Sequence, residues 1–167
     1  MNVALLFPGQ GSQYVGMGKS LAENFLESKH VFERVDEALG ENLSKLIWDG
    51  SEEVLKQTQN AQPALMATSM AAIEAARVVG FDFRNVRYVA GHSLGEYSAL
   101  CCSGAISLED TAIILSKRGK AMQSAVKLGE GAMAAIIGIS LEEVKEAISN
   151  ILDHEVCEVA NDNEPKQ

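Results

Sequence analysis

Apolar and polar residues alternate along this chain with the periods of both strands and helices. Residues 3–7 form an unbroken apolar run that ends at Pro8, a pattern typical of a strand buried on both faces. Residues 19–50 carry apolar side chains at helical spacing. Residues 61–79 predict a long helix rich in Ala and Met, with Pro63 near its first turn, where the missing N–H matters little.

The middle of the chain predicts a second strand, a sharp turn and two further helices. The strand covers residues 87–90, and the turn at 91–95 leads into a helix that ends near Cys102. Ser107, with acidic residues shortly after it, predicts the N-cap of a helix that continues to about Val126. Strands that alternate with helices in this way predict an α/β fold with a parallel sheet.

The last part of the chain has a pattern of its own. Residues 132–139 and 155–160 predict strands on either side of a helix at 141–151. A strand, a helix and a strand after a glycine-rich junction indicate a second, smaller α/β unit. We therefore divide the chain into a large subdomain, residues 1–128, and the start of a small one, residues 129–167.

Composition narrows the class of protein. The 167 residues are 47% apolar and 22% charged, which is ordinary for a globular protein, and no apolar run approaches the ~20 residues that span a bilayer. The net charge of -9 argues against nucleic-acid binding, which requires clustered Lys and Arg. The three cysteines include the adjacent Cys101 and Cys102 and form no disulfide framework, and the N-terminus lacks the basic residues of a signal peptide. We therefore expect a cytoplasmic protein that binds neither nucleic acid nor membranes.

The segment from Gly91 to Gly95 matches the nucleophile elbow G-x-S-x-G, with a predicted strand before it and a helix after it. Such a turn exposes the hydroxyl of Ser93, its glycines allow close backbone approach, and the helix N-terminus can stabilise an oxyanion. In an alternative interpretation, Ser93 and Glu96 form a capping box that merely starts the helix. His92 leaves the strand end on the other face, so we expect it to support the site and not to act as the general base.

A glycine-rich loop follows the first predicted strand and contains Gln10. The loop lacks the third glycine of a dinucleotide-binding loop, because that position is Tyr14. The later segment 18–20 lacks the first glycine of a P-loop, because that position is Gln13. Both nucleotide-binding interpretations therefore fail. The loop either presents Gln10 to an oxyanion hole or is a simple tight turn.

One charged residue lies on an otherwise apolar helix face. Arg118 shares that face with Ile114, Leu115, Met122 and Ala125. A buried guanidinium needs an anionic partner, because leaving it unpaired is costly. Three alternatives are open: a substrate carboxylate gripped by two N–H groups, an Asp or Glu of the protein, or escape to water from the helix edge.

Six segments of the chain together resemble one protein family, in order and in spacing. They are residues 7–13, 62–64, 91–99, 118–123, 131–135 and 160–163. The family is that of malonyl-CoA:acyl-carrier-protein transacylases and the related acyltransferase domains of fatty-acid and polyketide synthases. The resemblance implies an α/β-hydrolase-like parallel sheet with helices on both faces. It also implies an inserted ferredoxin-like subdomain, of which this chain holds the first half.

The same resemblance implies a mechanism and a set of site residues. A serine attacks malonyl-CoA, coenzyme A leaves, and the phosphopantetheine thiol of acyl carrier protein removes the malonyl group. The reaction belongs to fatty acid biosynthesis and needs no metal or redox cofactor. The matching positions are Ser93 as nucleophile, Gln10 and the backbone N–H of Leu94 as oxyanion hole, Arg118 as the grip on the malonyl carboxylate, and His92, Met122 and Asn161 around the substrate.

The chain departs from the family at the general base, which is a histidine far downstream. His30, His92 and His154 do not match that position. We therefore expect a fragment that covers about the first half of a family member and has weak activity or none. Full-length members are expected to be monomeric, whereas the fragment could associate through its open sheet.

Two other functions and one docking surface remain open. A serine esterase or thioesterase could use the same turn, although it would have no reason to keep Arg118 in its pocket. The chain could also be a non-catalytic binding module. Acyl carrier proteins are acidic, so a carrier would dock on a local basic patch against the overall charge. The densest basic stretch holds Lys117, Arg118, Lys120 and Lys127.

Overall fold

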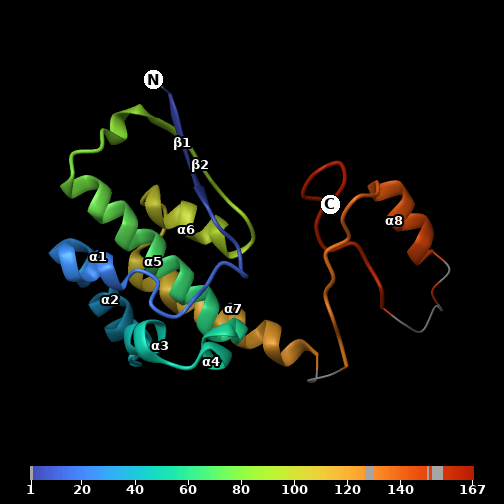
Figure 1. Ribbon diagram of the computed structural model, residues 1–167, viewed down its shortest axis with the longest axis horizontal. Coiled ribbons are helices and arrows are strands. Elements are labelled where there is room, and N and C mark those ends of the chain that lie inside the picture. The colour runs from blue at the N-terminus through green and yellow to red at the C-terminus, as the bar shows by residue number, and fades with distance from the viewer. Residues whose placement is uncertain (1, 127–129, 150, 152–155) are drawn as a thin grey trace. The chain divides into compact units, whose positions relative to one another are not determined.

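The computed structural model describes residues 2–126, 130–149, 151 and 156–167 (Figure 1). The chain forms two compact units, Met1–Lys127 and Leu128–Gln167. The predicted boundary between residues 128 and 129 lies outside the described residues. The elements of the first unit are β1 (Val3–Phe7), α1 (Lys19–Asn24), α2 (Leu26–Leu39), α3 (Leu43–Asp49), α4 (Glu52–Lys56), α5 (Thr58–Val78), the short helix η1 (Phe83–Asn85), β2 (Val86–Gly91), α6 (Leu94–Cys102) and α7 (Leu108–Ala125).

The two strands pair in parallel, which confirms the predicted α/β class. Leu5 lies opposite Val89, and the pairing continues to the end of β1. Helix α6 packs against both strands. The outward face of the sheet remains open, because Leu6 is 78% and Tyr88 74% exposed. The prediction that β1 is buried on both faces is therefore wrong for the described chain, since helices cover only its inner face.

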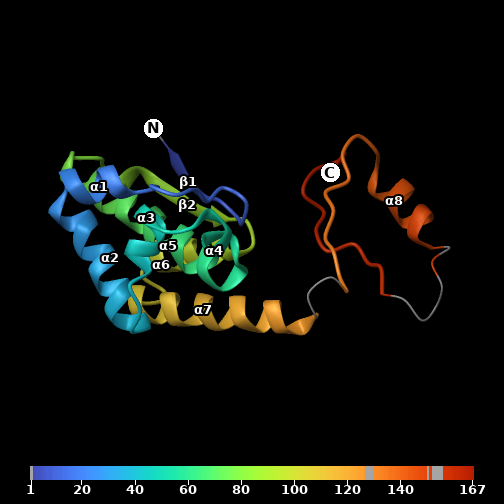
Figure 2. The same cartoon turned by 60° about the horizontal axis from the view of Figure 1, so that its bottom comes forward.

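Helix α5 forms the centre of the helical layer (Figures 1 and 2). It contacts α2, α6 and α7, and its residues 61–67 are all buried. Ser28 of α2 donates its hydroxyl to the carbonyl oxygen of Ala71 at 2.7 Å, which ties the two helices together. Helix α5 begins at Thr58, so Pro63 lies in its second turn and not in its first as predicted. No helix among the described residues is long and apolar enough to cross a membrane.

The second unit contains one described helix, α8 (Leu141–Ile148). Ser140 and Glu143 form a capping box at its start, as local sequence signals favour. The described residues in the segments 132–139 and 156–160 form no strand, so the two strand predictions are wrong there. A strand is stabilised by hydrogen bonds to a neighbouring strand, and no strand pairing is formed by the described residues of this unit.

Candidate active site

The turn between β2 and α6 holds Ser93 in an uncommon backbone conformation. Ser93 has φ 55° and ψ −111°, and no other non-glycine residue in the described ranges has a positive φ. Such a conformation costs about 1–3 kcal/mol and persists only where the surroundings enforce it. The Ser93 side chain makes no capping hydrogen bond, so the capping-box alternative is wrong. The turn has the geometry expected of a nucleophile elbow.

Two glycines allow the turn to pack tightly. A Cβ on Gly91 would lie 1.9 Å from the carbonyl carbon of Gly95. A Cβ on Gly95 would lie 2.4 Å from the carbonyl oxygen of Phe7, at the end of β1. The backbone N–H of His92 donates to that same oxygen at 3.1 Å. The elbow is therefore held against the carboxyl end of β1.

Arg118 joins α7 to the elbow. Its Nη2 donates to Ser93 Oγ at 3.1 Å, and its Nη1 donates to Gln62 Oε1 at 2.7 Å. The guanidinium carbon lies 5.7 Å from the centre of the Tyr97 ring. Within the described part of the chain, Arg118 forms no ion pair with a carboxylate. Of the alternatives left open by the sequence, pairing with an Asp or Glu is therefore not observed there, and a positive charge lies beside the serine hydroxyl.

Close packing of α7 on α5 brings Arg118 to its partners. A Cβ on Gly119 would lie 2.4 Å from Gln59 Cα, so only glycine fits at this contact without displacing backbone. Gln62 lies one turn beyond Gln59 and is fully buried. Its Nε2 donates to Met122 Sδ at 3.4 Å. No role was predicted for Gln62, although a polar amide within the otherwise apolar run 61–67 could have indicated a buried hydrogen-bonding residue.

Gln10 lies in the loop after β1, whereas Leu94 belongs to the elbow itself. Gln10 is exposed in the loop after β1, and its Nε2 donates to Thr58 Oγ1 at 3.3 Å. The loop passes close to the elbow, because a Cβ on Gly9 would lie 2.4 Å from His92 Nδ1. Leu94 is the first residue of α6 and is buried, and its backbone N–H has no acceptor within the helix.

The remaining predicted residues are Asn161, the basic residues Lys117, Lys120 and Lys127, and His154. Asn161 lies in the second unit and is exposed. Lys117 and Lys120 are exposed on α7, and Lys120 Nζ lies 3.9 Å from Glu41 Oε1. Lys127 and His154 lie outside the described residues. No group of three or more His, Cys, Asp or Glu side chains that could hold a metal ion occurs in the described ranges.

His30 belongs to a separate cavity of about 460 Å³ that Ser93 does not line. Cys101, Cys102 and Arg34 also line this cavity. Burial raises the pKa of both thiols, which makes them poor nucleophiles at neutral pH. None of the residues assigned to the catalytic site lies here.

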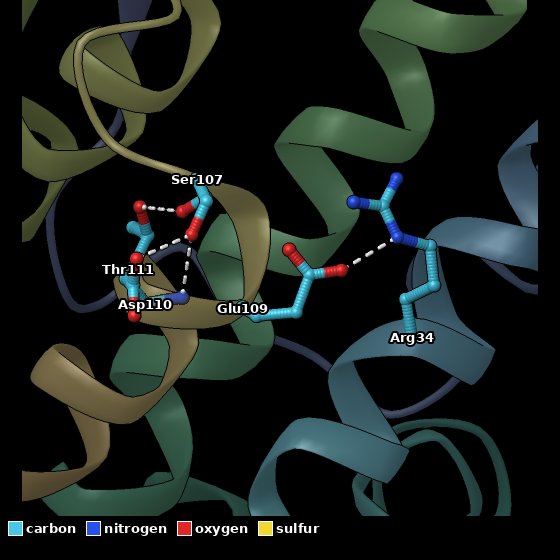
Figure 3. A network of polar contacts seen from close by, with 5 residues as sticks. All are labelled: Arg34, Ser107, Glu109, Asp110 and Thr111. Carbon is cyan, nitrogen blue, oxygen red and sulfur yellow. Dashed lines mark hydrogen bonds and ion pairs between the residues drawn. The ribbon is translucent and has the colours of Figure 1, made fainter.

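The start of α7, which carries Arg118 further along, is anchored by a network of polar contacts (Figure 3). Ser107 Oγ accepts the backbone N–H of Asp110 at 3.0 Å, which confirms the predicted N-cap. Arg34 Nε of α2 donates to Glu109 Oε1 at 2.7 Å and holds the pKa of that carboxyl below its usual range. The bond between Arg34 and Glu109 ties the first turn of α7 to α2.

The chain is similar to one family of known proteins. The family described as the acyl transferase domain matches residues 4–165. A malonyl CoA-acyl carrier protein transacylase of Bacillus subtilis strain 168 is 46% identical over 166 residues, which cover 99% of this chain and 51% of that protein. The chain spans about half the length of the curated relatives it matches.

Solved structures extend the similarity to three dimensions. The acyl-carrier-protein-S-malonyltransferase of Bartonella henselae superposes with a TM-score of 0.93 at 53% identity, over 98% of this chain and 52% of that one. A complex of a type II PKS acyl-carrier protein with its malonyl-transacylase gives a TM-score of 0.87 at 39% identity, over 93% of this chain and 50% of that one.

Proposed function

The chain belongs to the acyl transferase domain family, and from that membership we propose that Ser93 accepts a malonyl group from malonyl-CoA and passes it to the phosphopantetheine thiol of acyl carrier protein. The reaction is malonyl transfer in cytoplasmic fatty acid biosynthesis. Coenzyme A enters as part of the substrate and leaves as product, and the proposed steps use no metal or redox cofactor.

The contact between Arg118 and Ser93 carries this proposal. Arg118 Nη2 lies 3.1 Å from Ser93 Oγ, and the guanidinium has no carboxylate partner among the described residues. A planar guanidinium is suited to grip a carboxylate with two N–H groups. An acyl group with a carboxylate at its far end would thus be recognised beside the nucleophile. A hydrolase of neutral esters gains nothing from a cation at this place.

The chemistry proceeds in two balanced steps. In the first, Ser93 Oγ bonds to the thioester carbonyl carbon, the C–S bond breaks, and the serine proton leaves with the coenzyme A thiol. The backbone N–H of Leu94, with Gln10, is proposed to stabilise the oxyanion of the intermediate. In the second step, the sulfur of the carrier thiol bonds to the carbonyl carbon of the malonyl-serine ester, the bond from that carbon to Ser93 Oγ breaks, and the thiol proton returns to Ser93.

The proton from Ser93 needs a base, and none of the histidines of this chain is assigned that role. His30 lines the separate cavity. The ring of His92 lies against Gly9 in the loop after β1. Removing a member of such a catalytic unit typically lowers the rate by about 10³-fold or more. We therefore expect the 167-residue chain alone to be acylated slowly.

The carrier protein is proposed to dock at the exposed basic side chains of α7. Lys117 and Lys120 project from this helix, whereas the chain as a whole carries a net charge of -9. A local basic patch can steer an acidic partner against an unfavourable overall field. The similar malonyl-transacylase in the solved complex binds an acyl-carrier protein, which supports a carrier as the partner.

Intact-protein mass spectrometry tests the proposal directly. The chain is incubated separately with malonyl-CoA and with acetyl-CoA, beside the variants Ser93→Ala and Arg118→Ala. We expect a slow malonyl adduct that is lost in Ser93→Ala. Arg118→Ala should lower malonylation by about tenfold or more, because a hydrogen-bonded charge is removed, and should leave acetylation unchanged or faster.

Two results would contradict the proposal. An adduct that persists in Ser93→Ala would assign the reaction to another residue. Faster acetylation than malonylation of the unaltered chain would favour an enzyme that acts on neutral acyl groups. No adduct from either donor would show that this stretch of chain lacks transfer activity by itself.

A further inference from the structure

Gln62 is a fully buried amide in the most apolar part of α5. Burying an amide without hydrogen-bond partners is costly, because its lost bonds to water are not replaced. Gln62 avoids most of that cost, because its oxygen accepts from Arg118 Nη1 at 2.7 Å and its nitrogen donates to Met122 Sδ at 3.4 Å. Both partners lie on α7, so the Gln62 amide connects helix α5 to helix α7.

Chemistry fixes which way this amide points. A guanidinium has only N–H donors, so the group that faces Arg118 must be the carbonyl oxygen of Gln62. The amide nitrogen then faces Met122, whose thioether is a weak acceptor. The orientation is therefore set by the bond to Arg118, which is the shorter of the two contacts.

We propose that Gln62 is the positioning residue that aims the Arg118 guanidinium at Ser93 and thereby sets the preference for acyl groups that carry a carboxylate. The inference rests on the proposed function, in which Arg118 grips that carboxylate. Arg118 has a long side chain that loses rotamer entropy when it is ordered. Gln62 and the nearby Tyr97 ring hold it before substrate arrives, so less is lost on binding.

The neutrality of Gln62 is part of the argument. An acidic residue at this position would also hold the guanidinium, but it would neutralise the charge meant for the substrate. An apolar residue would leave the charge of Arg118 available to the substrate but would not orient its side chain. An amide provides an acceptor without a charge, so it orders Arg118 and preserves its attraction for an anion.

Three variants of the full chain separate these effects. Gln62→Leu removes the acceptor and is compatible with the apolar surroundings, and Gln62→Glu keeps an acceptor but adds charge. Gln59→Leu makes the same change one turn earlier in α5 and is the matched control, because the Gln59 amide donates to Gln57 Oε1 whereas Arg118 bonds to Gln62. Circular dichroism and thermal unfolding verify that each variant folds.

The first readout is the order of the Arg118 guanidinium, followed by nitrogen NMR of its side chain. A held guanidinium rotates slowly about its C–N bonds and gives separate Nη signals. We expect separate signals in the unaltered chain, in Gln62→Glu and in Gln59→Leu, and one averaged signal in Gln62→Leu. This readout does not depend on activity.

The second readout is the rate of malonyl adduct formation on Ser93 divided by the rate of acetyl adduct formation. Gln62→Leu and Gln62→Glu should each lower this ratio by about tenfold, and Gln59→Leu should not. If adducts form too slowly to measure, the chemical shift of the Arg118 signals is followed on titration with malonate. Gln62→Leu and Gln62→Glu should then bind malonate more weakly than the unaltered chain, and Gln59→Leu should not.

Separate Nη signals in Gln62→Leu, or an unchanged ratio in both Gln62 variants, would overturn the inference. A preference of the unaltered chain for acetyl donors, or no response of Arg118 to malonate, would instead contradict the proposed function. The two failures are therefore distinguishable, because Arg118 order in Gln62→Leu is measured without any substrate.

Discussion

Replacing Ser93 by glycine should leave the protein more stable than replacing it by alanine, although both changes remove the proposed nucleophile. Ser93 has φ 55° and ψ −111°, a region that glycine enters freely and other residues rarely adopt. The surrounding turn enforces this conformation, because Gly91 and Gly95 allow it to pack against its own backbone and against β1. Stability is thus sacrificed at the residue whose hydroxyl lies beside Arg118.

The magnitude follows from a comparison of two variants. Ser93→Ala keeps a Cβ and the strain, whereas Ser93→Gly loses both, and each lacks the hydrogen bond from Arg118 Nη2. Relief of strain is worth about 1–3 kcal/mol. Glycine gives back roughly 0.5–1 kcal/mol, because it makes the unfolded chain more flexible. We therefore expect the free energy of unfolding of Ser93→Gly to exceed that of Ser93→Ala by about 0.5–2 kcal/mol.

Urea unfolding followed by the fluorescence of Trp48 measures this difference. Trp48 is the one tryptophan of the chain and packs edge to face on Phe32 at 5.1 Å, so it reports on the unit that contains the elbow. The expected difference displaces the midpoint by about 0.2–1 M urea. Equal midpoints, or a higher midpoint for Ser93→Ala, would refute the claim that the turn is strained.

Three further changes test the packing, an ion pair and the thiols. Gly91→Ala should lower the free energy of unfolding by about 1–3 kcal/mol or more, because the new Cβ meets backbone at 1.9 Å; an unchanged urea midpoint would contradict this. The pKa of Glu109 is lowered in the folded state by Arg34, so its contribution, at most about 0.5 kcal/mol for this exposed pair, is present above about pH 5 and lost as the pH falls toward 3. Glu109→Gln should therefore be less stable than the unaltered chain at neutral pH and equal to it in acid, as urea unfolding at both pH values would measure. Burial raises the pKa of the Cys102 thiol and shields it, so iodoacetamide at neutral pH should label the exposed Cys157 first, and the reverse order by mass spectrometry would refute this.

Much of the first unit could be predicted from the sequence, because its signals are local. The β1 run, the glycines of the elbow and the Ser107 cap each depend on residues within a few positions. The errors concern contacts with distant parts of a chain. Two-sided burial of β1 and the strands at 132–139 and 156–160 require covering or pairing partners, which a local pattern cannot show.

The candidate site divides in the same way. Local patterns in the sequence predicted an elbow at Ser93 between a strand and a helix, and placed Arg118 on an apolar helix face. The contacts of Arg118 with Ser93 and Gln62, and with no described carboxylate, could be read from the folded chain alone. Ser93 comes from the turn before α6 and Gln62 from α5, so both contacts depend on how distant segments pack. The close approach of α7 to α5 at Gly119 is one such contact, and no local propensity encodes it.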